Sequence, residues 1–239
     1  MQVPDGITAA STVIVDNTAQ QPLVSTIKSL LDGAYLARLS VGYLFVEGLA
    51  PLVDALDNVD RIELLIGNVV NRLTDEQLRE SGLLPVAIRA VDEEFAADFR
   101  EARNRAATET ALNLRVTIDK LARNDHNGDL LISLAHWIAA GKLRVRLSTR
   151  HRLHAKVTIA GYPDDHPLAP GRAIVGTSNF TMPLATTRDS AGSNIDVLLQ
   201  GKQNYDQLMA WYDHHWMEAQ DFHRELFEVL GRAWPLVRS

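Results

Sequence analysis

Residues 21–67, QPLVSTIKSLLDGAYLARLSVGYLFVEGLAPLVDALDNVDRIELLIG, decide the fold class, because helical and extended patterns alternate along them. Apolar residues at helical spacing over 22–34 predict an amphipathic helix, and a β-branched and aromatic run over 37–46 predicts a strand. A second helical pattern covers 48–59 and is followed by a buried strand at 61–68. Helices and strands in this alternation favour an α/β sheet.

Further from this stretch, most of the expected strands fall in the second half of the chain. We predict strands at 12–17, 142–148, 152–160, 172–179 and 193–200, and helices at 129–141, 204–220 and 221–234. Residues 125–128, Asp-His-Asn-Gly, are expected to form a turn. No linker or internal repeat divides the sequence, so we expect one domain over residues 1–239.

A long charged segment at about 91–123 is also predicted to be helical. It reads as a helical excursion from the sheet, and it could cover the core or extend towards a partner. The acidic run near its beginning is typical of a helix N-terminus.

The composition is that of a globular protein, with 46% hydrophobic residues, no cysteine and a formal net charge of −6. A protein that coats nucleic acid would be basic, which this chain is not. The positive charge is local, because residues 141–156 contain six Lys and Arg side chains and no acid. The sequence shows no signal-peptide pattern and no apolar run near the ~20 residues of a membrane span. We therefore expect a cytoplasmic protein with no membrane partner.

The chemistry begins in the stretch RLHAKVTIA, at 152–160, where side chains alternate between the two faces of a strand. Leu153, Ala155 and Val157 form an apolar face, so His154 and Lys156 point together to the other face. An imidazole and an ammonium placed two residues apart can converge on one phosphate group.

Two further stretches carry polar residues near strand ends. In AIVGTSNF, a buried strand should end at Gly176, and Thr177, Ser178 and Asn179 then offer backbone N–H groups and an amide to an anion. In SNIDVLL, alternation places Asp196 on a polar face, where a carboxylate could hold an imidazole in the useful tautomer.

Together, His154-x-Lys156, Gly176-Thr177-Ser178-Asn179 and Asn194-x-Asp196 resemble the motifs of the phospholipase D superfamily. The likeness is to its nuclease branch and to the phospholipase-D-like N-terminal domains of bacterial Swi/Snf-type and DEAD/DEAH helicases. It is firm over 141–220 and looser over 35–67. The resemblance implies an α/β fold with a mixed, largely buried β-sheet flanked by helices on both faces, here with a long helical insertion.

The resemblance also implies a mechanism without metal or cofactor. His154 would attack phosphorus and form a phosphohistidine. Lys156 and Asn179 would hold the non-bridging oxygens, Ser178 would assist, and Asp196 would orient a histidine. The chain carries one motif, so a second histidine for the leaving group implies a homodimer in which two copies of His154 meet at the active-site face.

Some residues depart from the family pattern or leave their role open. Gly161 stands where the family often has an aspartate, Asp196 replaces a glutamate, and Thr177 replaces a serine. Thr177, Arg150 and Arg152 are candidates for substrate binding, although the arginines could instead form a solvated strand face. A structural role is also open for each catalytic candidate.

Three functions follow from these patterns. The first is a metal-independent nuclease that acts on DNA, in one chain or complex with a helicase motor. The second is a catalytically silent DNA-binding or dimerisation domain of such a helicase. The third, and weakest, is a phospholipid hydrolase, because the sequence shows no basic amphipathic helix for a bilayer.

Overall fold

The computed structural model describes residues 12–16, 23–44, 46–67, 99–150, 153–178 and 195–233. In this part of the chain the strands are β1 (Thr12–Asp16), β2 (Leu36–Val41), β3 (Arg61–Ile66), β4 (Leu143–Leu147), β5 (Lys156–Gly161), β6 (Gly171–Gly176), β7 (Ile195–Leu199) and β8 (Gln220–Asp221). The helices are α1 (Leu23–Leu31), the 3-10 helix η1 (Val46–Leu52), α2 (Val53–Asp57), α4 (Phe99–Lys120), α5 (Asp125–Ala139), α6 (Lys202–Glu218) and α7 (His223–Gly231).

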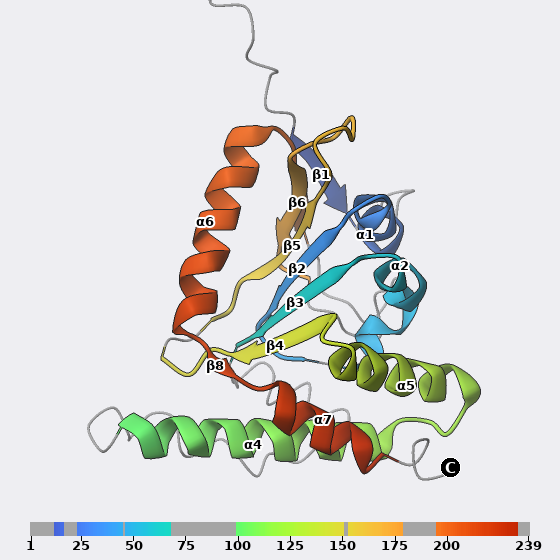
Figure 1. Cartoon of the computed structure of the whole chain (residues 1–239), viewed down its shortest axis with the longest axis vertical. Helices are drawn as coiled ribbons and strands as arrows, with labels where there is room; N and C mark the ends of the chain where they lie inside the picture. The colour runs from blue at the N-terminus through green and yellow to red at the C-terminus, as the bar shows by residue number, and fades with distance from the viewer. Residues whose placement is uncertain are drawn as a thin grey trace, which may run out of the picture.

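All eight strands belong to one mixed sheet, in the order β1-β7-β6-β5-β2-β3-β4-β8. Strands β2, β3 and β4 are parallel, whereas the other neighbours pair antiparallel. The helix-strand alternation of residues 21–67 accounts for the parallel pair β2 and β3. Helix α6 covers one face, and α1, α2 and α5 lie on the other side (Figure 1). The predicted fold class, a mixed α/β sheet with helices on both faces, is confirmed.

The two faces of the sheet carry separate hydrophobic layers. The larger layer joins α1, α2 and α5 to the sheet through residues such as Ile27, Leu39 and Leu64. The smaller layer lies under α6, where Tyr212 is fully buried against Ile159. The Tyr212 hydroxyl donates a hydrogen bond to the Glu63 carbonyl at 2.9 Å, which satisfies its polar end.

The described part of the predicted helical excursion covers the core. Residues Leu114 and Ile118 of α4 are buried in the larger hydrophobic layer, and α4 packs beside α7 at one end of the molecule (Figure 1). Residues 91–98 lie outside the described residues. That residues 1–239 form one domain stays a prediction.

Three local predictions were wrong. The strand expected at 37–46 ends at Val41, and η1, which contains Pro51, begins at Val46. Helix α5 begins at Asp125, where we expected a turn, because the Asn124 side chain caps the helix by accepting from the Asn127 backbone N–H at 2.8 Å. Strand β8, Gln220–Asp221, lies where the helices expected at 204–220 and 221–234 were to meet.

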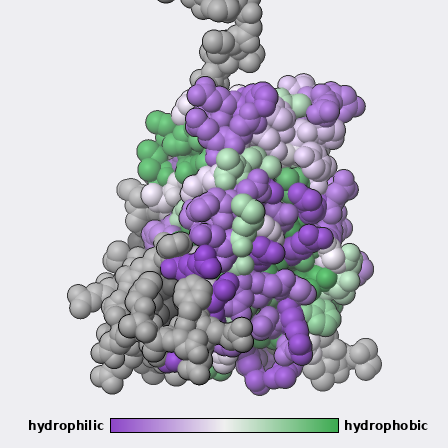
Figure 2. Space-filling view, turned by 60° about the vertical axis from the view of Figure 1, so that its left-hand side comes forward, coloured by the Kyte–Doolittle hydropathy of each residue, from purple (hydrophilic) through white to green (hydrophobic). Residues whose placement is uncertain are grey.

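One face of the molecule is mostly polar among the described residues (Figure 2). The side of the molecule that carries α6 is largely hydrophilic (Figure 2). Among the described helices, none has the length and apolar character that crossing a bilayer requires.

Candidate active site

The candidate residues meet at one edge of the sheet, where β5 begins, β6 ends and β7 begins. These strands pair antiparallel, so their ends lie side by side. The register places Lys156 opposite Gly176, and Gly176 opposite Asp196. Three strands therefore bring an ammonium and a carboxylate into one row on one face, with a glycine between them.

Gly176 makes room for the Asp196 carboxylate. A Cβ atom at Gly176 would lie 1.9 Å from Asp196 Oδ1, so no other residue fits this position without displacing the carboxylate. Asp196 is 2% exposed and Lys156 is 8% exposed. Desolvation by burial lowers the pKa of Lys156, and the Asp196 carboxylate opposes this shift by stabilising the ammonium.

His154 lies two residues before β5, because the strand expected at 152–160 begins only at Lys156. His154 is exposed, while its ring contacts the buried lysine. Lys156 Nζ is 3.0 Å from His154 Nδ1 and 3.1 Å from Nε2. Burial lowers the pKa of His154 below its ordinary value of 6.5, and the Lys156 charge lowers it further. The lowered pKa favours the neutral imidazole, which is the form that can act as a nucleophile.

Ser178 donates a hydrogen bond to each oxygen of the Asp196 carboxylate. Its hydroxyl donates to Asp196 Oδ2 at 2.5 Å, and its backbone N–H donates to Oδ1 at 3.3 Å. Within the described residues, no hydrogen bond joins Asp196 to His154 of the same chain. The carboxylate thus acts on Ser178 and on the charge of Lys156, and the expected role of orienting a histidine would need a histidine from elsewhere.

Two of the remaining candidates, Thr177 and Arg150, make contacts with residues other than His154. Thr177 is exposed, and its Oγ1 accepts from the Ile195 backbone N–H at 3.1 Å, so it ties β6 to β7. Arg150 is partly exposed, and its Nη1 lies 3.5 Å from Glu218 Oε1. Asn179 and Arg152 lie outside the described residues.

The space enclosed behind Lys156 is too small for a ligand. A cavity of about 10 Å³ lies between Lys156, Ser178, Asp196 and the α1 residues Leu23 and Ile27. This volume holds no more than one water molecule. A phosphate group would therefore approach from the exposed side of His154. In the part of the chain that is described, no three His, Asp or Glu side chains are grouped to hold a metal ion.

This arrangement suits the binding of an oxyanion. A neutral imidazole and a buried ammonium lie within hydrogen-bonding distance of each other, and the imidazole is open to solvent. Sequence analysis identified these two residues but missed the partnership of Gly176 with Asp196. The glycine at position 176 indicates that another group approaches the backbone there, but the sequence does not show that this group is the Asp196 carboxylate.

Solved structures provide the likeness to known proteins, since no family model and no curated protein matches the chain. Phosphatidylserine synthase from Haemophilus influenzae is 14% identical, with a TM-score of 0.51, and the match covers 95% of this chain and 43% of that one. This likeness shows a shared fold.

Two smaller proteins are also similar in structure. A phospholipase D family member, Nuc from Salmonella typhimurium, is 14% identical with a TM-score of 0.45, over 89% of this chain and 97% of that one. NucT from Helicobacter pylori is 9% identical with a TM-score of 0.43, over 89% and 99% of the two chains.

Proposed function

We propose that this chain is a phosphodiesterase of the phospholipase D type that cleaves DNA. The proposal depends on one observation, the contact of exposed His154 with buried Lys156 at the sheet edge that also carries Asp196. The motif resemblance and the shared fold support it. DNA is the substrate class that the nuclease-branch motifs imply.

The proposed reaction has two steps. A ring nitrogen of the neutral His154 attacks phosphorus, the bond from phosphorus to the leaving oxygen breaks, and the protonated His154 of a second copy donates its proton to that oxygen. Water then attacks the phosphohistidine, transfers a proton to the second histidine and releases His154. The geometry of the second copy is part of the proposal.

Lys156 would neutralise a non-bridging oxygen while Asp196 keeps the ammonium charged. The amide of Asn179 would hold the same phosphate, as the motif resemblance implies. We further propose that the chain works in the cytoplasm beside a helicase motor, in one polypeptide or one complex.

A second candidate function is a catalytically silent DNA-binding or dimerisation domain. The observation that favours it is the contact itself, because Lys156 Nζ lies within 3.1 Å of both ring nitrogens of His154 and engages the nucleophile. In the enzyme, the phosphate must draw this ammonium away from the ring. In a silent domain, the contact persists when DNA is bound.

A cleavage assay separates these functions. A labelled oligonucleotide is incubated in EDTA with the unmodified protein, with His154→Ala, and with His136→Ala, which removes an exposed histidine on α5. We expect cleavage to fall by about 10³-fold or more in His154→Ala, because the nucleophile is lost. His136→Ala should cleave normally. A covalent protein–DNA adduct should appear on a denaturing gel with the unmodified protein and with His136→Ala, and it should be missing with His154→Ala.

The contrary outcomes are distinct. Cleavage that survives His154→Ala, or that stops in EDTA, contradicts the mechanism. Tight DNA binding without turnover, unchanged by His154→Ala, identifies the silent domain. Release of choline from phosphatidylcholine vesicles would instead support a phospholipid hydrolase, the third function.

A further inference from the structure

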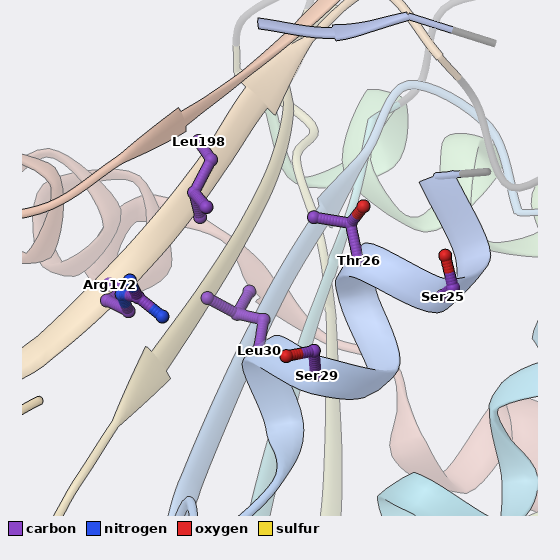
Figure 3. Close-up of a pocket in the computed structure, with 6 residues that line it drawn as sticks. All are labelled: Ser25, Thr26, Ser29, Leu30, Arg172 and Leu198. Atoms are coloured by element: carbon purple, nitrogen blue, oxygen red, sulfur yellow. The ribbon is translucent and has the colours of Figure 1, made fainter. Parts of the chain in front are cut away.

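A second polar cavity lies on the same side of the sheet as the candidate active site, between α1 and strands β6 and β7. Its volume is about 250 Å³, and Ser25, Thr26, Ser29, Leu30, Arg172 and Leu198 line it (Figure 3). The volume exceeds the space behind Lys156 many times over, and it is large enough for a phosphate group.

Arg172 supplies the positive charge of this cavity. It lies on β6 four residues before Gly176, so both face the α1 side, and they are separated by about 13 Å along the strand. Its Nε is buried and has no hydrogen-bond partner among the described residues. An unpaired buried guanidinium nitrogen is costly, and a bound anion would satisfy it.

Helix α1 contributes three hydroxyl groups opposite this arginine. Ser25, Thr26 and Ser29 are spaced three and four residues apart, so they lie on one side of the helix. The close-up shows Leu30 between Arg172 and the side chains of Thr26 and Ser29, and Leu198 on the same side as Arg172 (Figure 3). None of the six lining residues is acidic. Asp32 acts electrostatically on Tyr162, as Arg172 does, and it does not line the cavity.

We propose that this cavity is a phosphate-binding site, separate from His154 and Lys156. Guanidinium and hydroxyl groups donate hydrogen bonds to phosphate oxygens, and the two leucines limit the access of water to them. The phosphate could belong to the backbone of the bound nucleic acid or to a free phosphate monoester. The first source rests on the proposed function, whereas the binding of phosphate itself does not.

Titration of the whole chain with inorganic phosphate tests the site. Calorimetry measures the affinity, and NMR locates the bound phosphate. Arg172→Gln keeps the length of the side chain and removes the charge. Ser29→Ala removes one hydroxyl at an exposed helix position, so it decides the question if Arg172→Gln does not fold. Arg224→Gln on α7, 82% exposed, is the matched loss of charge elsewhere.

We expect Arg172→Gln to weaken phosphate binding at this site by about 10-fold or more, because hydrogen bonds from a charged donor are lost. Ser29→Ala should weaken it by less, and Arg224→Gln should not change it. NMR shifts should map to α1 and β6, and they should survive Lys156→Met. Phosphate binding by Arg172→Gln equal to that of the unmodified protein, at the same α1 and β6 resonances, overturns the proposal.

A second comparison identifies the source of the phosphate. If the site holds a backbone phosphate, Arg172→Gln raises the KM for a long oligonucleotide and leaves cleavage of a dinucleotide unchanged. If the ligand is a free monoester, phosphate binding falls while oligonucleotide binding stays normal. An inactive protein that still loses phosphate binding in Arg172→Gln contradicts the proposed cleavage and supports the site.

Discussion

Two charged clusters lie on opposite faces of the same sheet. In one, the charges are paired with each other, and in the other a neighbouring side chain is open to solvent. Under α6, Arg38 Nε is 2.8 Å from Glu63 Oε2 and Arg38 Nη2 is 2.8 Å from Asp213 Oδ1. The Tyr212 ring covers the guanidinium, with its centroid 5.0 Å away. On the α1 face, Lys156 and Asp196 are equally buried, but their neighbour His154 reaches solvent.

The first arrangement stabilises the fold, whereas the second can take part in catalysis. In the Arg38 cluster every charge has an opposite charge within the chain, so the cluster fastens α6 to β2 and β3. In the His154 cluster one carboxylate supports one ammonium, and a neutral imidazole extends this pair to the surface. The same sheet thus holds one closed ion network and one that a ligand can complete.

The largest expected effect comes from opening the closed network. Arg38→Ala leaves the Glu63 carboxylate buried without its cation, and we expect a loss of about 3–5 kcal/mol in the free energy of unfolding. Urea denaturation measures it. Arg224→Ala, which removes an exposed helical ion pair, is the control and should change stability little. Equal, small losses in both variants would remove the distinction between the clusters.

Removing the charge of the open cluster should affect catalysis instead. Lys156→Met keeps the aliphatic stem, and we expect cleavage to fall by about 10²–10³-fold because the transition-state charge loses its ammonium. Burial disfavours that ammonium, and Asp196 keeps its two hydrogen bonds from Ser178, so the free energy of unfolding should fall by less than in Arg38→Ala. Lys202→Met, at an exposed residue, should leave both quantities unchanged. A variant that is unstable but fully active would place Lys156 with the structural cluster.

A methyl group at Gly176 tests whether the Asp196 carboxylate lies against this glycine, in the row that Lys156, Gly176 and Asp196 form across β5, β6 and β7. Gly176→Ala places a Cβ atom against the Asp196 carboxylate, and we expect a loss of about 1–3 kcal/mol in stability, together with weaker cleavage. Thermal unfolding measures the first effect. Gly231→Ala is the control, because nothing lies within 4 Å of the added Cβ atom. A normal melting temperature for Gly176→Ala would contradict the described position of Asp196.

The smallest expected effect is a lowered pKa of His154. Burial first and the Lys156 charge second lower the pKa of His154 below 6.5, so the neutral imidazole should persist to lower pH than in the unfolded chain. The NMR titration of the His154 ring against pH measures this. Lys156→Met should raise the pKa only part of the way, because desolvation remains. An unshifted titration in the folded protein would contradict the contact with Lys156.

Part of this arrangement could be predicted from single strands. The alternation in residues 152–160 placed His154 and Lys156 on one face, and the structure brings their side chains into contact. The same reasoning did not give the partner of Asp196 within the chain, where Asp196 accepts two hydrogen bonds from Ser178. Its expected role of orienting a histidine stays a prediction. Alternation specifies a face, whereas the choice of partner depends on the register between strands.

The amino-acid sequence alone determined the alternation of helices and strands, and with it the α/β class, because apolar spacing reports which side of each element is buried. It also determined which side chains of one strand share a face. The tertiary structure alone decided the row of Lys156, Gly176 and Asp196, the closed pairing of Arg38 with Glu63 and Asp213, and the cavity beside Arg172. These depend on contacts between residues far apart in the chain, whose distances are set by strand register and helix packing and leave no local pattern.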